Sequence, residues 1–255
     1  MTDTTASFRS RVLGGETLFG LFLDLASPIA AEICARAGYD WLLVDLEHGA
    51  ATEADLMGLL HAVEAGGSIP VVRPQSGERL RIGRALDLGA RGIMVPRLES
   101  ATEASEAVTF LRYPPAGVRG VALRARGADL GAIGHGDVGK INERIVGIVQ
   151  IESAGALRQA EAIAAIDGVD VLFVGPADLT HSLGIPGRFS EAAYRQALTA
   201  VVGACRAHGK AAGILIYDTA VVPDLLELGF TFIGIGADAA FVAAGARVAM
   251  QAVRG

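Results

Sequence analysis

The sequence predicts an α/β fold, a (β/α)₈ barrel that forms one domain over residues 1–255. The first observation behind this prediction is a unit of helix, glycine and short apolar run that recurs along the chain. The second is the length, because eight strand–helix units occupy about 250 residues in barrels of this kind. The third is the composition: 51% of the residues are hydrophobic and 20% are charged, which suits a large core.

The recurring unit places a glycine between a helical stretch and an apolar run, at Gly38, Gly89, Gly168 and Gly229. A glycine just past a helix end relieves the left-handed conformation that often terminates helices. The continuous apolar runs that follow are typical of strands buried on both faces. Repeated passages from helix to strand therefore predict parallel strands joined by crossover helices.

Eight apolar runs qualify as strands, and we expect them in this order: Leu18–Leu23, Trp41–Asp45, Pro70–Arg73, Gly92–Pro96, Val146–Ile151, Val171–Val174, Ala212–Ile216 and Thr231–Ile235. The alternative is an open, doubly wound sheet. That fold usually carries a Gly-x-Gly-x-x-Gly turn after its first strand, and this chain has none there. The barrel is the better interpretation.

Sequence signals also mark where several helices begin. Ser27 precedes Pro28, an arrangement typical of a helix cap followed by proline in the first turn. Thr52 with Asp55, and Ser100 with Glu103, have the spacing of a capping box. The interval 112–143 is the longest between two expected strands, and such a length favours a lid or binding loop.

Charge and apolar patterning exclude several classes of protein. A net charge of −6 gives no basic footprint for nucleic acid. No apolar run approaches the roughly 18–20 residues of a membrane helix, and the polar start at residues 1–7 lacks the order of a signal peptide. The two distant cysteines, Cys34 and Cys205, suit a reducing compartment. We therefore expect a cytoplasmic protein without nucleic-acid or membrane partners.

Polar side chains follow several of the expected strands. Asp45, Glu47 and His48 end the second strand and Arg73 ends the third. Gln150 and Glu152 end the fifth, and Asp178 follows the sixth. Because active sites of parallel barrels lie at the carboxyl ends of the strands, we expect these groups around one mouth.

Glu152 and Asp178 are the candidate metal ligands, because two carboxylates without nearby cysteine or a second histidine suit a hard dication such as Mg²⁺ or Mn²⁺. Alternatively, each carboxylate caps the helix that follows, a role that Ser153 could also fill.

His48 is the candidate general base, with Asp45 or Glu47 fixing its tautomer; the less favoured alternative is an ordinary loop histidine. Arg73 suits a carboxylate or a developing enolate, and its alternative role is a structural ion pair with Asp45 or Glu47.

Five strings in the same order resemble the HpcH/HpaI family of metal-dependent 2-oxo-acid aldolases, which includes 4-hydroxy-2-oxoheptanedioate aldolase and 2-dehydro-3-deoxyglucarate aldolase. They are Gly38-Tyr-Asp-Trp-Leu-Leu-Val-Asp-Leu-Glu-His48, Pro70-Val-Val-Arg-Pro74, Arg112-Tyr-Pro-Pro-Ala-Gly-Val-Arg-Gly120, Val149-Gln-Ile-Glu152 and Gly175-Pro-Ala-Asp-Leu179. The resemblance extends from about residue 18 to about residue 242.

The resemblance implies a role for each matching residue. His48 would be the catalytic base, Arg73 would stabilise the enolate, and Glu152 and Asp178 would hold the metal. Gln150, Ala177 and Asp178 would hold the 2-oxo acid. Asp45 would belong to the catalytic group, and Asp87 would raise the basicity of the histidine, acting from a neighbouring subunit because it lies near a helix C-terminus on the far side of its own barrel.

The resemblance also implies a barrel of the phosphoenolpyruvate/pyruvate-binding type, built as a homohexamer with an exchanged C-terminal helix around Phe241–Val253. The implied activity is that of a carbon–carbon lyase, a class II aldolase of aromatic or sugar acid catabolism. It would use Mg²⁺, Mn²⁺ or Co²⁺ and reversibly cleave a 4-hydroxy-2-oxo acid to pyruvate or hydroxypyruvate and an aldehyde.

The lysine count agrees with a metal as the electron sink. Lys140 and Lys210 are the only lysines, and neither follows a strand, so no lysine is placed to form an imine with substrate. Two departures from the family, at Arg124 to Arg126 and in the shortened segment 184–190, put the aldehyde partner in question.

Three alternatives remain open: an acyl-CoA lyase of the same superfamily, a phosphosugar enzyme and a metabolite-binding barrel without activity. The first lacks a basic rim for CoA, and the second lacks a phosphate cup at the last two strands. The third is disfavoured by the polar strand ends.

Overall fold

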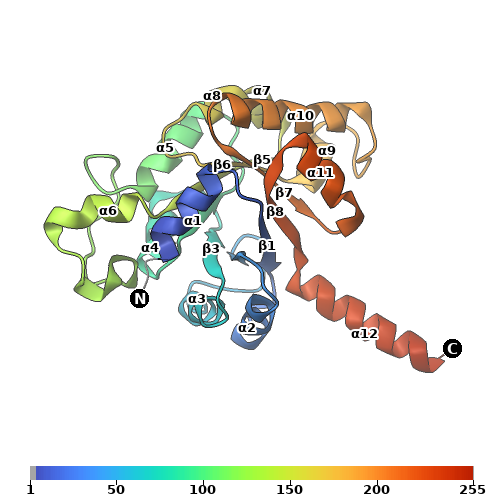
Figure 1. Ribbon diagram of the computed structural model, residues 1–255, viewed down its shortest axis with the longest axis horizontal. Coiled ribbons are helices and arrows are strands. Elements are labelled where there is room, and N and C mark those ends of the chain that lie inside the picture. The colour runs from blue at the N-terminus through green and yellow to red at the C-terminus, as the bar shows by residue number, and fades with distance from the viewer. Residues whose placement is uncertain (1–3, 255) are drawn as a thin grey trace.

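The computed structural model describes residues 4–254 and contains a closed barrel of eight parallel strands that lie in chain order (Figure 1). The strands are β1 (Leu18–Leu23), β2 (Trp41–Asp45), β3 (Ile69–Arg73), β4 (Gly92–Val95), β5 (Val146–Ile151), β6 (Val171–Val174), β7 (Ala211–Ile216) and β8 (Phe230–Ala237). Each of the eight predicted runs is a strand, with ends shifted by at most two residues. The predicted (β/α)₈ fold is confirmed.

Alternate residues of each strand point into the barrel, where large aromatic rings fill the interior. Trp41 stacks on Phe232 with ring centroids 4.3 Å apart, and Phe22 and Phe173 pack against Trp41 at 6.4 Å. The residues between them, such as Leu42, point outward and pack against the surrounding helices. The interior is therefore a packed core, so any site must lie at its ends.

The helices cover the outside of the barrel in the order that the crossover rule requires. They are α2 (Pro28–Arg36), α3 (Leu56–Ala65), α4 (Arg79–Asp87), α5 (Ala101–Leu111), α7 (Ala154–Arg158), α8 (Ala160–Ala164), α9 (Pro176–Ser182), α10 (Ala192–Ala207) and α11 (Val222–Leu228). No helix in the described part of the chain is long and apolar enough to cross a membrane.

Two predicted helix starts are confirmed. Ser27 Oγ accepts a hydrogen bond from the Ala30 amide, and Ser100 Oγ accepts one from the Glu103 amide. The third differs, because α3 begins after Asp55 and not after Thr52. The Asp55 carboxylate still accepts the Thr52 amide at 2.9 Å, so it orders the turn before the helix.

A helix before the first strand closes the amino end of the barrel. Phe8 and Val12 of α1 (Thr4–Leu13) belong to the same apolar cluster as the barrel interior. Arg9 of this helix donates to the buried Asp170 at 2.8 Å. In the described part of the chain, α1 therefore covers the barrel at the amino ends of its strands.

The long interval is not a lid over the mouth at the carboxyl ends of the strands. It contains two 3₁₀ turns, η1 (Arg126–Gly131) and η2 (His135–Asp137), and the short helix α6 (Val138–Asn142). It joins α5 to β5, and such helix-to-strand connections lie at the amino ends of the strands. The expectation of a lid over this mouth was wrong, because length alone does not tell which end of the barrel a loop occupies. The alternative, a binding loop, stays a prediction.

The last helix extends away from the barrel. Figure 1 shows α12 (Asp238–Arg254) projecting beyond the other elements, and Asp238 is its only buried residue in the described chain. Val242, Val248 and Val253 are at least 60% exposed.

Candidate active site

The inward-facing pattern of the strands continues into polar residues at the mouth. On five strands, the last apolar side chain of the interior is followed two residues later by a polar one that faces the same way. The pairs are Phe22 and Asp24, Leu43 and Asp45, Val71 and Arg73, Ile148 and Gln150, and Leu215 and Tyr217. Glu152 follows Gln150 at the same spacing. Polar groups that are scattered along the sequence therefore lie around a single opening, as the sequence predicted.

Arg73 is the best-fixed group of the mouth. Its guanidinium donates to both oxygens of Asp45, from Nε at 2.9 Å and from Nη2 at 2.5 Å. Nη1 reaches Gln150 Oε1 at 3.4 Å, and the guanidinium carbon lies 5.4 Å from the Phe22 ring centroid. The structural ion pair considered from the sequence does exist, and it leaves Nη1 facing Gln150 across the mouth.

Asp45 does not contact the imidazole of His48. Besides binding Arg73, its carboxylate accepts the backbone amides of Glu47 at 3.0 Å and His48 at 3.3 Å. Asp45 therefore fixes the turn that carries the histidine. Of the two carboxylates considered for the tautomer, only that of Glu47 lies near the ring, with Oε2 3.8 Å from His48 Nε2.

His48 is solvent-facing, with 64% of its side chain exposed. A group at the rim can exchange protons with water and with a bound ligand. Glu47 lies beneath it and is partly buried. Burial raises the pKa of the Glu47 carboxyl, opposed by the positive charges of Arg73 and His48.

Glu152 is a buried carboxylate in a strongly acidic setting. One oxygen accepts the Arg97 amide at 2.7 Å, and Gly175 leaves room beside the other, since a Cβ there would lie 3.1 Å from Oε2. Burial raises the pKa of Glu152, and the charges of Glu47 and Asp178 add to the effect. The hydrogen bond from the Arg97 amide and the positive charge of Arg73 oppose this rise in the pKa.

Arg97 was not singled out by the sequence. Its φ is +56°, in the left-handed region that residues with a side chain rarely adopt. That conformation aims its amide at Glu152 and leaves the carboxylate one fixed hydrogen bond. No signal in the sequence marks a non-glycine residue for this conformation.

Neither candidate metal ligand is used as a helix cap. Ser153 caps α7 with its own hydroxyl, which accepts the Ala156 amide at 3.0 Å, so Glu152 is free of that role. Gly175 precedes α9, and both Ala177 and Asp178 lie exposed in its first turn. The capping alternative is therefore disfavoured for both carboxylates.

The donor set fits a hard divalent cation. Glu152 and Asp178 interact electrostatically, and Glu47 Oε2 is buried without a hydrogen bond, 3.4 Å from Arg73 Nε. No group of three or more His, Cys, Asp or Glu side chains in residues 4–254 is arranged to hold a metal by itself. Two carboxylates plus water or substrate oxygens remain the arrangement that these residues support.

Asp87 is not brought to this mouth. It ends α4 at the opposite end of its own barrel, and its carboxylate accepts a hydrogen bond from Arg119 Nη2 at 2.8 Å. A role for Asp87 at this kind of mouth therefore requires a neighbouring subunit, and it stays a prediction. Both lysines are also remote, because Lys140 lies in α6 and Lys210 Nζ donates to the Ile166 carbonyl.

Asp24 was also missed from the sequence. It directly follows β1, and the alternation of Leu18, Gly20 and Phe22 into the barrel is the signal that could have found it. Burial and the neighbouring charges of Asp45 and Asp238 raise the pKa of Asp24 to about 6.

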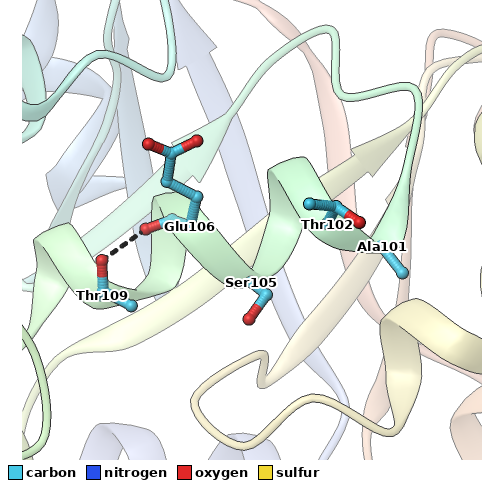
Figure 2. Close-up of a pocket in the computed structure, with 5 residues that line it drawn as sticks. All are labelled: Ala101, Thr102, Ser105, Glu106 and Thr109. Atoms are coloured by element: carbon cyan, nitrogen blue, oxygen red, sulfur yellow. Dashed lines mark hydrogen bonds between the residues drawn. The ribbon is translucent and has the colours of Figure 1, made fainter.

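A second depression on the surface carries no site. Figure 2 shows it along α5, lined by Ala101, Thr102, Ser105, Glu106 and Thr109. Thr109 Oγ1 donates to the Glu106 carbonyl within the helix. Short side chains from one helix do not converge on a ligand, so the mouth remains the candidate.

Comparison with known proteins agrees with this geometry. A family model described as HpcH/HpaI aldolase/citrate lyase matches residues 18–244. A hydroxypyruvate/pyruvate aldolase from Paraburkholderia phytofirmans is 44% identical, with all of both chains covered. A 2-keto-3-deoxy-L-rhamnonate aldolase from Klebsiella pneumoniae is 40% identical over 91% of this chain and 86% of that protein. The crystal structure of an HpcH/HpaI aldolase/citrate lyase family protein from Burkholderia cenocepacia matches with a TM-score of 0.92 and 40% identity, covering 98% of this chain and 100% of the other.

Proposed function

Since the chain belongs to the HpcH/HpaI aldolase/citrate lyase family, we propose that it is a metal-dependent class II aldolase that reversibly cleaves a 4-hydroxy-2-oxo acid to pyruvate or hydroxypyruvate and an aldehyde. The observation that carries this function is the mouth itself. A guanidinium pinned by Asp45 lies at the same opening as the buried Glu152 and its acidic neighbours. The names of the relatives favour an aldolase over an acyl-CoA lyase.

The cofactor in this proposal is a divalent cation, Mg²⁺, Mn²⁺ or Co²⁺, bound by Glu152 and Asp178. When bound, such an ion acts as a Lewis acid on the 2-oxo group of the substrate. The fixed amide of Arg97 orients one carboxylate oxygen of Glu152, which leaves the other free beside Gly175. Gln150 and the backbone at Ala177 hold the 2-oxo acid next to it.

The proposed proton and electron movements involve few groups. His48 takes the proton of the C4 hydroxyl, the C4–O bond becomes the aldehyde carbonyl, and the C3–C4 electron pair moves into the enolate of the keto acid. Arg73 stabilises the negative charge of that enolate, because its fixed guanidinium needs no reorganisation as charge develops. A proton then returns to C3 and completes the keto acid.

We also propose a homohexamer in which α12 is exchanged and Asp87 supports the histidine of a neighbouring subunit. Two observations support it: the valines of α12 are exposed on their own subunit, and Asp87 stays partly accessible although Arg119 holds it. An oligomer covers the apolar side chains that α12 presents to water.

The test is a chelation experiment on release of pyruvate from a 4-hydroxy-2-oxo acid. We expect excess chelator to abolish release and Mg²⁺, Mn²⁺ or Co²⁺ to restore it. Full activity in excess chelator contradicts the metal-dependent mechanism.

A further inference from the structure

One part of the mouth is not used by the proposed handling of the keto acid. Arg73 ends β3, Gln150 and Glu152 end β5, and Asp178 follows β6. The remaining rim lies at the ends of β7, β8 and β1, where Tyr217, Gly236 and Asp24 are respectively found. We name these three residues the acceptor sector. In the closed order of eight strands, β1 lies diametrically across from β5. Asp24 and Glu152 therefore stand on opposite sides of the opening.

The backbone of Asp24 is held in place from two sides. Its amide donates to Asp238 Oδ1 at 2.7 Å, and its carbonyl accepts the Ala50 amide at 2.8 Å. Asp238 is 3% exposed and begins α12, so β1 is tied to the last helix at this point. The side chain of Asp24 is consequently presented from a fixed position.

The carboxylate of Asp24 has no hydrogen bond or ion pair with any residue from 4 to 254. It is only half-buried, and the charges of Asp45 and Asp238 raise its pKa while those of Arg73 and His48 lower it. A carboxylate in such a position retains acceptor capacity for a hydroxyl group. Negative charge in excess of positive charge around it also makes the sector unfavourable for a second anion.

Aromatic rings lie close to the glycines near the end of β8. A Cβ on Gly236 would lie 3.1 Å from the Phe241 ring and 3.9 Å from that of Tyr217, and one on Gly234 would lie 3.3 Å from Phe22. Tyr217 is 67% exposed. The sector thus combines aromatic side chains, one of them exposed, with one unpaired carboxylate.

We propose that the acceptor sector binds the aldehyde half of the substrate, and that Asp24 makes it select aldehydes that carry hydroxyl groups and no negative charge. This inference rests on the proposed aldolase function. The keto acid occupies the side with Arg73, Gln150 and Glu152, so the carbon chain beyond C4 extends toward the free rim. Hydroxyls on that chain donate to Asp24, whereas a carboxylate there is repelled.

The experiment compares two aldehydes of equal length, glycolaldehyde and glyoxylate, each with pyruvate and Mg²⁺. The kcat/KM for both is measured for the parent protein and for Asp24→Asn, with Asp24→Ser as a second variant. Asp224→Asn, which neutralises an exposed carboxylate on α11, is the matched control. Exchange of the pyruvate methyl protons in D₂O is followed in parallel, because it reports enolate formation without any aldehyde.

We expect Asp24→Asn and Asp24→Ser to shift the glyoxylate-to-glycolaldehyde ratio of kcat/KM by about tenfold toward glyoxylate, the size of a close charge repulsion at a partly exposed site. Asp224→Asn leaves the ratio unchanged. A ratio that moves by less than twofold in both Asp24 variants, while methyl exchange persists, overturns this inference alone. If the parent protein does not exchange the methyl protons of pyruvate, both the aldolase function and this inference are overturned.

Discussion

The two ends of the barrel both bury acidic side chains, and they surround them differently. At the amino end, Asp170 is fully buried and receives Arg9 at 2.8 Å, the Gly147 amide at 2.9 Å and Arg112 at 3.6 Å. At the carboxyl end, Glu152 has one backbone amide for a partner, and Asp24 has none among the described residues. Asp170, whose hydrogen-bonding capacity is used within the protein, stabilises the fold. Glu152 and Asp24 have few partners and can still bind a ligand.

The largest effect is expected from Glu152→Gln. The change removes one of two proposed ligands and should lower activity about a thousandfold, the scale of the several kcal/mol that a catalytic cation contributes. Titration with Mn²⁺, followed calorimetrically, should show correspondingly weaker binding. Unchanged Mn²⁺ affinity would contradict the proposed role of Glu152 as a metal ligand.

Arg73→Lys should follow, with kcat about a hundredfold lower, because lysine cannot make both bonds to Asp45 while facing the enolate. Mn²⁺ affinity should be preserved, which separates this role from that of Glu152. Turnover equal to that of the parent protein would remove the enolate-stabilising role.

At the other end, Asp170→Asn should cost about 2 kcal/mol in the free energy of unfolding, because Arg9 and Arg112 lose their buried counter-charge. Denaturant titration measures this loss, and kcat of the folded variant should be unchanged. A loss of kcat without a loss of stability would contradict the division between the two ends.

The smallest effect concerns pH. Because the pKa of Asp24 is raised to about 6 in the folded protein, folding binds a proton there, and this group's contribution to stability falls as pH rises from about 4 to about 6. Asp24→Asn should therefore gain about 1 kcal/mol at pH 7, after allowance for solvent screening of a half-buried group. The gain should vanish near pH 4. A variant less stable than the parent at pH 7 would contradict the unpaired state of Asp24.

The sequence was sufficient for the fold because each strand is a continuous apolar run after a glycine, and burial on both faces leaves that pattern. It also predicted the residues at the mouth, since parallel strands bring their carboxyl ends together. It left open whether Arg73 pairs with Asp45 or Glu47, because the two carboxylates lie only two residues apart in the chain. Arg97 was missed because its role depends on a backbone conformation. Asp24 was missed because a single aspartate after a strand resembles any turn residue.

The seal that α1 forms at the amino end has a kinetic consequence. Phe8 and Val12 complete the packed interior cluster at the amino end, so a ligand reaches the mouth from the carboxyl side of the strands. Buried Arg73 and Gln150 lie deeper in that opening than exposed Tyr217. In the proposed reaction the keto acid is thus first in during synthesis and last out during cleavage, and the aldehyde must depart before it.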